Sequence, residues 1–443
     1  MSIVGLSEEE IHKFIDTLTD EEHLQLQSIY SELNKSILER VYELIYSVYP
    51  QFKLLFFLCL LQRILISYGT LFNRNVFHII FGIFGFLILS DRNHFAPTVL
   101  IHLTYFICLF LTIKFFKNFP FLPFIITILS TFTMQHYFND KIYSSIHGSL
   151  MIMSMKMISL VFENNIDFFE VFGYLFSPGT LVYGPFISLK MYRLSYQTKL
   201  FSNLYVPILS SILSCLFLFL SHYIVNEIDV LNYNSLLINY KTAASFRYSH
   251  YFISYISLTL ASLSGIPINQ VTSWLNVEIP RSMMDVACYW NIPMHIFFHK
   301  YVFQKIKAYG KFLAVLFTFT FSAMLHGFNF QLTAVLISIG VNASIESKLR
   351  SRLSSRLNSC CKSRRCLENC DHYYKTYHFR TLIVNFLFFI INVYHLIYLG
   401  APFDDSVEEG TYSMDHTLKI WSQEFYFSSL IITFVMLVAS FLI

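Results

Sequence analysis

The sequence predicts an all-α polytopic membrane protein. Of its 443 residues, 55% are hydrophobic and only 13% are charged, and the mean hydropathy of +0.52 is too high for an ordinary soluble domain. Several apolar runs approach the roughly 17 to 25 residues that a helix needs to cross a bilayer. Backbone groups in lipid must bond within helices, and the sequence has no series of short alternating strands. A net charge of +3, with scattered basic residues, argues against a nucleic-acid partner.

Residues 1–50 are the only long polar region and are predicted to form a separate amphipathic helical segment. Ser7 and Glu10 have the spacing of a capping box, and apolar residues recur at helical spacing from Ile11 to Leu18. The segment lacks the basic start and apolar centre of a cleaved signal peptide. The transmembrane domain is therefore expected to occupy residues 51–443, with its first span directing insertion.

Apolar stretches then follow in order and predict about ten or eleven crossings. The candidate spans are 53–71, 76–90, 97–116, 121–138, 146–162, 203–225, 248–266, 311–340, 379–400 and 425–443. Residues 170–199 are interrupted by proline and glycine, and irregular backbone at membrane depth must be covered by protein or line a water-filled cavity. We therefore expect re-entrant or interfacial pieces between the fifth and sixth spans.

The stretch 311–340 contains a histidine, His326, in the middle of an apolar run. An imidazole removed from water costs free energy unless it is neutral, hydrogen-bonded or facing a polar cavity. Polar residues at spacings of three and four would share one side of a helix with it. This stripe consists of Thr318, Ser322, His326, Asn329 and Thr333. The pattern predicts one helix that turns the stripe toward a cavity, and a histidine bonded across a helix interface is the alternative.

Asn291 is the second candidate. Pro293 suits the first turn of a helix and biases Ile292 away from helical geometry, so Asn291 is expected where an extended segment meets a helix start. An amide there could orient a reacting group or donate to a developing oxyanion. A simple helix cap is the alternative.

Residues 348–378 are predicted to form a basic, cysteine-rich cytoplasmic loop. Lysine and arginine are concentrated between 348 and 365, whereas acidic residues between the last two spans are expected on the opposite side. The loop contains Cys360, Cys361, Cys366 and Cys370, followed by His372. A reducing compartment disfavours disulfides, and no standard Cys-x-x-Cys pair is present. Free thiols are favoured, while reversible acylation and structural zinc stay open.

Several segments resemble the membrane-bound O-acyltransferase family. They are WNIP at 290–293, KYVF at 300–303 and SAMLHGF at 322–328, with further likeness in PRSM at 280–283, SRRC at 363–366 and YHLIYLG at 394–400. The resemblance covers roughly residues 270–430. In that family an asparagine or aspartate and an intramembrane histidine are the two signature polar residues, and they match Asn291 and His326. The resemblance implies a bundle of about ten or eleven transmembrane helices, with re-entrant or interfacial helices, around a central tunnel.

Within the family, these residues look most like members that acylate a serine of Wnt proteins. This implies transfer of a palmitoleoyl group from palmitoleoyl-CoA to a Wnt serine in the endoplasmic reticulum membrane, enabling Wnt secretion and signalling. The expected partners are Wnt, acyl-CoA and membrane lipids, with no bound cofactor and no metal. His326 would rest neutral and act as the base, and Asn291 would orient the reacting groups. Trp290, Ser322 and Asn329 would shape the substrate-binding site.

Other readings are open. A related enzyme could acylate a lipid or a peptide, and a secondary transporter could also carry a midplane histidine, although it should show repeated halves. His295 and His299 lie four residues apart and could hold a metal, but a di-iron enzyme needs several such pairs. An interfacial helix over 295–309 is favoured for them.

Overall fold

A computed structural model describes residues 35–68, 74–89, 95–116, 119, 121–138, 140–163, 167–227, 235–367, 369–404 and 413–443. The chain divides into two compact units, residues 1–52 and 53–443. In the first unit the described part is the beginning of helix α3 (Ile37–Tyr68). The capping box expected at Ser7 and Glu10 lies outside the described residues.

The second unit is built from helices. They are the rest of α3, then α4 (Arg74–Leu89), α5 (Phe95–Phe115), α6 (Leu122–Tyr137), α7 (Asp140–Leu160), α8 (Phe168–Leu175), α9 (Pro178–Leu181), α10 (Leu189–Ser195), α11 (Tyr205–Glu227), α12 (Ser235–Leu263), α13 (Trp274–Glu278), α14 (Met283–Tyr289), α15 (Ile292–Phe298), the π-helix η2 (His299–Phe303), α16 (Gln304–Ile306), the 3-10 helix η3 (Lys307–Tyr309), α17 (Lys311–Leu325), α18 (Phe330–Arg356), α19 (Phe379–Gly400), α20 (Met414–Gln423) and α21 (Ser428–Leu442). Within the described ranges the only β pairing is an isolated bridge between Ser359 and Tyr374. The predicted all-α class is confirmed.

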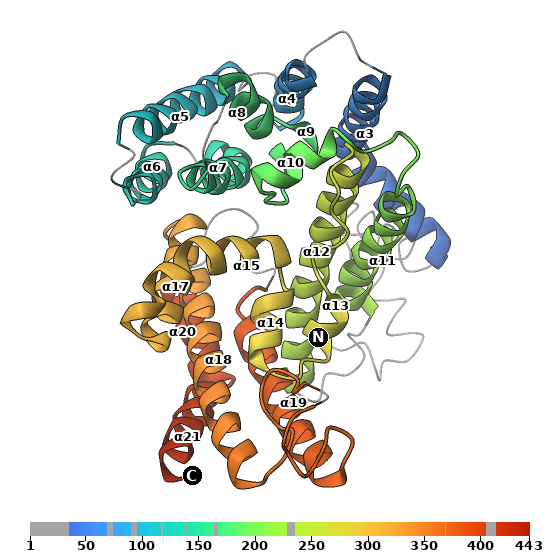
Figure 1. Ribbon diagram of the computed structural model, residues 1–443. Coiled ribbons are helices and arrows are strands. Elements are labelled where there is room, and N and C mark those ends of the chain that lie inside the picture. The colour runs from blue at the N-terminus through green and yellow to red at the C-terminus, as the bar shows by residue number, and fades with distance from the viewer. Residues whose placement is uncertain are drawn as a thin grey trace, which may run out of the picture. The chain divides into compact units, whose positions relative to one another are not determined.

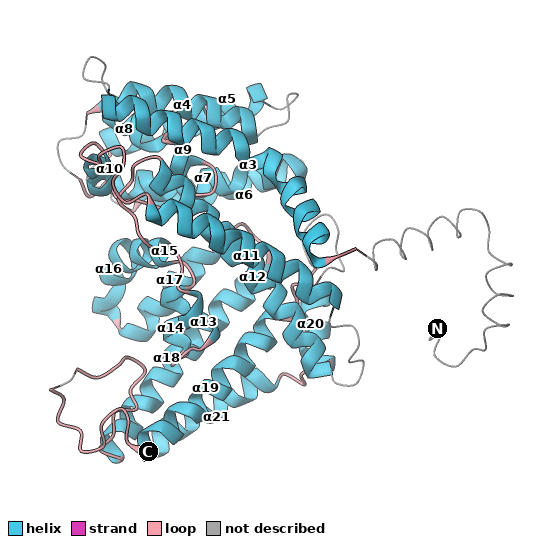
Figure 2. Cartoon of the chain, turned by 90° about the vertical axis from the view of Figure 1, so that its right-hand side faces the viewer, coloured by secondary structure: helices cyan, strands magenta, loops and turns pink. Residues whose placement is uncertain are grey.

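Helix α12 connects two groups of helices within this unit. It packs against α11, α9 and α19, and Figures 1 and 2 show it running from the group that contains α4 to α10 toward the group that contains α14 to α21. In the first group α4 contacts α8 and α9, and α7 contacts α5 and α6. In the second group α18 contacts α14, α17 and α21.

Residues 170–199 are irregular, as the sequence predicts, and short helices α8, α9 and α10 occupy most of them. A fully buried lysine, Lys156 of α7, fastens this segment by donating to the carbonyl of Tyr174 at 2.9 Å and the hydroxyl of Thr180 at 2.7 Å. Buried backbone carbonyls need such donors when no helix supplies them. The broken segment is thereby held against α7.

Long apolar helices make this a multi-pass membrane protein. Among the described residues, four helices are long and apolar enough to cross a bilayer, or up to six if each of two bent pairs forms one span. Shorter apolar helices over Asn75–Gly85 and Lys311–Leu325 accompany them. The expected ten or eleven crossings are therefore not all single long apolar helices, because several of the predicted stretches are short or broken.

The expectation of one helix over 311–340 is wrong. Helix α17 ends at Leu325, Gly327 has a φ of +92°, and α18 begins at Phe330 with Asn329 as its N-cap. A positive φ is favourable for glycine because it has no Cβ, so the helix ends there. Helix α18 also continues to Arg356, so the first part of the predicted loop 348–378 is helical.

Candidate active site

His326 lies at the break between α17 and α18. Its backbone N–H donates to the carbonyl of Ala323 at 3.1 Å and that of Ser322 at 3.2 Å, so the residue is the C-cap of α17. Its side chain is half-buried. His326 therefore belongs to neither helix. It lies between the carboxyl end of α17 and the amino end of α18. The predicted polar stripe therefore does not follow one helix face.

Helices α6 and α7 cover this break. Gln135 of α6 accepts from the N–H of Phe328 at 2.7 Å, so a backbone donor in the turn between the two helices is paired. Tyr143 of α7 lies so close to Gly327 that a Cβ on the glycine would meet its hydroxyl oxygen at 2.8 Å. The glycine is therefore required both by its backbone geometry and by the close approach of α7.

Two further histidines approach His326. His147 of α7 is close enough to the backbone of His326 to interact with it, and both His147 and His250 of α12 interact electrostatically with the His326 ring. Among the described residues, the buried Nε2 atom of His147 has no hydrogen-bond partner. His147 and His250 therefore lie near His326, each on its own helix.

Trp290 connects this group to Asn291. The rings of His250 and Trp290 are stacked, with centroids 4.3 Å apart and planes inclined by 19°. The Nε2 of His250 also lies 3.2 Å from the carbonyl oxygen of Trp290, which fixes this nitrogen as the protonated one because a carbonyl can only accept. His250 therefore positions the end of α14 next to the histidine group.

Asn291 is the N-cap of α15, and its side-chain oxygen accepts from the N–H of Met294 at 3.1 Å. The predicted helix start is confirmed, and so is the capping alternative. The neighbouring segment fixes this corner, since the carbonyl of Val271 accepts from the N–H of Ile292 at 2.8 Å. The capping oxygen is engaged, so the donor that Asn291 can offer to a substrate is its Nδ2 group.

A buried ion pair holds α12 to α13 near His250. Arg247 donates to both carboxylate oxygens of Glu278, at 2.8 and 2.9 Å, and the hydroxyl of Tyr251 donates to the same carboxylate at 2.8 Å. Arg247 is only 4% exposed. A bidentate arginine–carboxylate contact fixes orientation as well as distance.

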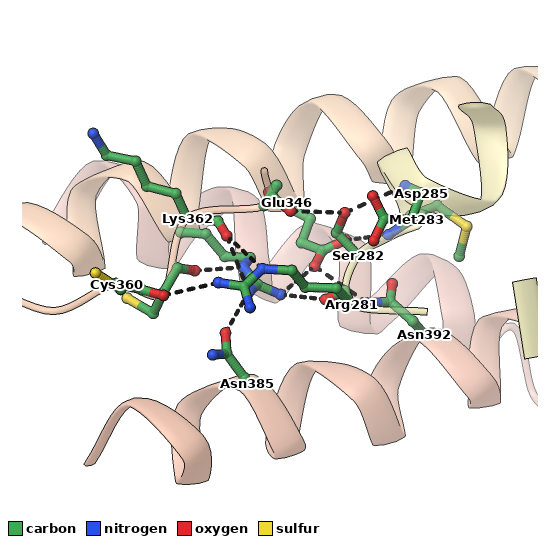
Figure 3. A network of polar contacts seen from close by, with 12 residues as sticks. Arg281, Ser282, Met283, Asp285, Glu346, Cys360, Lys362, Asn385 and Asn392 are labelled. Carbon is green, nitrogen blue, oxygen red and sulfur yellow. Dashed lines mark hydrogen bonds and ion pairs between the residues drawn. The ribbon is translucent and has the colours of Figure 1, made fainter. Parts of the chain in front are cut away.

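A second buried network fixes the start of α14. The N–H of Met283 donates to Glu346 of α18 at 2.8 Å, and the amide of Asn392 on α19 donates to the other carboxylate oxygen at 3.2 Å. Arg350 bonds that oxygen at 3.0 Å and also donates to the carbonyl of Arg281 at 2.6 Å. Figure 3 shows Glu346 and Asn392 of the two long helices together with Arg281, which precedes α14, and Met283, the first residue of α14.

Aromatic and aliphatic side chains line the region beside the break. Phe297, Phe298 and Tyr301 pack with Phe321 and Leu325 in one buried cluster that also includes residues of α7. The rings of Phe298 and Phe321 meet nearly edge to face, at 83°. Residues of α15, η2, α17 and α7 therefore form one buried apolar cluster that reaches Leu325, next to His326.

The structure puts the predicted substrate residues in different settings. Ser322 is buried on α17, Trp290 stacks on His250, and Asn329 caps α18 by accepting from the N–H of Leu332 at 3.2 Å. The sequence did not point to His147 and His250, because each is a single histidine on a helix that is far from His326 in sequence. Their local sequence carries no signal for the contact.

His295 and His299 do not form part of a metal-binding group among the described residues. Their rings stack with centroids 5.9 Å apart, and the Nε2 of His299 contacts the side-chain amide of Gln304 at 3.0 Å. The expected helical setting is confirmed, although residues 299–303 are a π-helix. In contrast, Cys360, Cys366, Cys370 and His372 do lie together.

Comparison with known proteins gives consistent matches. The family model for the membrane-bound O-acyltransferases matches residues 100–362. The protein-serine O-palmitoleoyltransferase porcupine of Homo sapiens is 32% identical over 421 residues, which cover 84% of this chain and 90% of the relative. The Mus musculus protein of the same name is 32% identical over 74% of this chain and 80% of its own. The Drosophila melanogaster protein of the same name is 26% identical over 65% of this chain and 62% of the relative.

Proposed function

Because the chain belongs to the membrane-bound O-acyltransferase family, we propose that it transfers a palmitoleoyl group from palmitoleoyl-CoA to a serine hydroxyl of a Wnt protein. The single observation that carries this proposal is the identity of 32% to a protein-serine O-palmitoleoyltransferase over 84% of this chain. The resemblance of its motifs to the Wnt-acylating members supplies the acceptor. We also propose that the protein resides in the endoplasmic reticulum membrane, as the same resemblance suggests, and its long apolar helices support a location in a membrane.

In the proposed mechanism His326 is the general base. As the serine oxygen attacks the thioester carbonyl, the imidazole accepts the serine proton, and it returns this proton to the departing CoA thiolate. No acyl-enzyme is required, because the acceptor attacks the thioester directly. The half-buried position of His326 at the break supports this role, since the ring is partly shielded from water and can still be reached by a substrate.

Asn291 would orient the reacting carbonyl and stabilise the oxyanion that forms on it. Its Nδ2 group is the remaining donor, and a positioned donor of this kind is worth about 10²- to 10³-fold in rate. Trp290 is proposed to bind substrate on the face that is not stacked on His250. Ser322 and Asn329 are proposed to contact substrate from the ends of α17 and α18.

The proposal is tested by measuring transfer from labelled palmitoleoyl-CoA to a Wnt peptide in purified detergent-solubilised protein. His326→Ala should lower kcat by at least about 10²-fold while the protein remains folded, because it removes the proton acceptor. Asn291→Ala should lower the rate by a similar or smaller factor. Full activity of His326→Ala would contradict the assignment of the base.

Substitution of the acceptor distinguishes the nearest alternative. If a lipid or an unrelated peptide were acylated faster than the Wnt peptide, the enzyme would be a family member with another acceptor. The transporter alternative finds no support among the relatives named above. A Wnt peptide with alanine in place of its serine is the matched control and should accept no label.

A further inference from the structure

Three cysteines and one histidine meet in the segment after α18. The ligand atoms of Cys360, Cys366, Cys370 and His372 all lie within 4.8 Å of one another. The Sγ atoms of Cys360 and Cys370 are 3.3 Å apart, and the Nδ1 of His372 lies 3.8 Å from Cys360 Sγ and 3.7 Å from Cys366 Sγ. The four side chains therefore surround a single small volume.

These separations suit a tetrahedral zinc site. Zinc binds cysteine sulfur at about 2.3 Å and histidine nitrogen at about 2.0–2.1 Å, so ligands at tetrahedral angles lie roughly 3.5 to 3.8 Å from one another. Three thiolates with one imidazole are a common structural zinc set, and soft sulfur ligands disfavour magnesium and calcium. A water molecule would fit the same volume less well than zinc, because thiol groups form only weak hydrogen bonds with it.

The tautomer of His372 also suits metal binding. The hydroxyl of Ser354 donates to the carbonyl of Ser359 at 2.5 Å, so its oxygen can accept from the Nε2–H of His372, which lies 2.9 Å away. This arrangement leaves the Nδ1 lone pair directed at the cysteine sulfurs. Metal-binding histidines usually donate their other nitrogen in this way, because the second contact fixes the ring.

The backbone closes the segment around the four ligands. The N–H of Cys360 donates to the carbonyl of Tyr374 at 2.9 Å, and the N–H of Tyr374 donates to the carbonyl of Asn358 at 2.9 Å. These two bonds hold Tyr374 next to residues 358–360. His372 lies two residues before Tyr374 and is therefore held beside Cys360. Lys375 lies 3.7 Å from Cys370 Sγ, where its charge would offset the excess negative charge of three thiolates around a divalent ion.

We propose that Cys360, Cys366, Cys370 and His372 bind one zinc ion. Zinc binding would displace the thiol protons and hold the segment in the closed form seen here. Cys361, which the sequence groups with these cysteines, does not belong to the site, although it is fully buried.

The ion would act on the candidate active site through the backbone of residues 360–363. The carbonyl of Cys360 accepts from Arg281 at 2.8 Å, and the carbonyl of Cys361 accepts from Arg350 at 2.7 Å. Figure 3 shows Cys360 and Lys362 beside Arg281, in the network that holds the start of α14. The proposed zinc is therefore structural, and it stabilises the segment that leads to Trp290 and Asn291.

Metal analysis of the purified full-length protein tests the proposal. Protein purified without immobilised metal and washed with a weak chelator should retain one zinc per chain, or take up one equivalent when zinc is supplied. Cys366→Ser and His372→Ala should bind zinc at least tenfold more weakly. His372→Cys should retain the metal, because a thiolate can replace the imidazole as a ligand, and this rescue separates ligation from general misfolding.

Cys361→Ala is the matched control and should keep its zinc, since its side chain lies outside the group. Failure of the wild-type protein to bind one equivalent of zinc would overturn the proposal. So would a disulfide between Cys360 and Cys370 in peptide mapping without reductant, or acyl thioesters on these cysteines that hydroxylamine releases. Because metal content is read without acyl transfer, the result is independent of the proposed function.

Discussion

His250 contacts Trp290 through both its ring face and its Nε2–H, so it positions a residue that is proposed to bind substrate. His250→Phe should keep the stacking but lose the hydrogen bond. A small displacement of a positioning group can cost about 10²-fold in rate, so we expect kcat to fall by about 10- to 100-fold with little change in thermal stability. Steady-state kinetics of acyl transfer measures this effect.

A glutamine retains a donor near the Nε2 position, and His250→Gln should recover part of the rate that His250→Phe loses. A purely structural role would instead make both variants less stable and equally slow. Unchanged kcat in His250→Phe would show that the contact with Trp290 does not matter for the reaction.

Gly327 combines a positive φ with a close neighbour, and its replacement should be costly. Gly327→Ala forces a Cβ to within 2.8 Å of the Tyr143 hydroxyl and puts a non-glycine residue at a φ of +92°. Backbone strain of this kind costs about 1–3 kcal/mol. The midpoint of thermal unfolding in detergent should fall, and activity with it.

Two further variants separate the effect of the clash with Tyr143 from the effect of the positive φ. Adding Tyr143→Phe removes the hydroxyl and should restore part of the stability, namely the part lost to the clash. Gly148→Ala lies on the same helix as Tyr143, no described residue comes within 4 Å of its new Cβ, and it should be harmless. Equal losses in Gly148→Ala and Gly327→Ala would contradict this account.

Single residues could be chosen as site candidates from the sequence where the side chain is of a type that is rare in the segment around it. His326 is the only titratable side chain between Phe312 and Gly340, and Asn291 precedes a proline that marks a helix start. His147 and His250 could not be found in this way, because only tertiary packing brings their helices to His326. His372 was visible next to the cysteines, but only the contact between residues 358–360 and 374 makes it a ligand candidate and leaves Cys361 out.

At the scale of elements, the ion pair between α12 and α13 should be needed for the position of His250. Glu278→Gln removes the charge that compensates buried Arg247, and loss of one partner of a buried pair costs about 3–5 kcal/mol. We expect the unfolding midpoint and the activity to fall together.

The double variant Arg247→Met with Glu278→Leu leaves no charge buried, so it should be more stable than Glu278→Gln alone. Denaturation of the three proteins in mixed micelles provides the comparison. A double variant less stable than the single one would mean that the polar contact contributes net stability here.

The break between α17 and α18 illustrates what periodicity can and cannot predict. The spacing of three and four from Thr318 to Thr333 fits a helix, but it does not reveal that the helix ends and the chain turns at Gly327. A local signal was present, because a glycine followed two residues later by asparagine is a common helix end and N-cap. Apolar flanks on both sides concealed it.

At the scale of the whole molecule, the distribution of charge predicts sidedness. The basic residues up to Arg365 are expected in the cytoplasm and residues 404–415 on the opposite side. A glycosylation sequon tag inserted between residues 408 and 409 should be modified in cells, and the same tag inserted after Arg356 should not. Sensitivity of the upper band to an endoglycosidase checks the result, and the reverse pattern would refute the assigned orientation.

The fold class followed from composition alone, whereas the number of crossings did not. Hydropathy detects apolar length, but the short helices α8 to α10 and the bent pair Met414–Gln423 and Ser428–Leu442 do not fit single straight spans. The form of α8 and α9 depends on the buried donor Lys156 of α7, which bonds the carbonyl of Tyr174 and the hydroxyl of Thr180. Sequence spacing carries no record of such contacts.

The meeting of two helix ends at His326 has an electrostatic consequence. The carboxyl end of α17 carries roughly half a negative charge and the amino end of α18 roughly half a positive one. If the imidazole accepts a proton during transfer, the first end stabilises the new cation, and the second favours the negative oxygen that develops on the acyl group. The interruption between the helices thus brings two helix ends of opposite partial charge together beside His326, which a single uninterrupted helix could not supply.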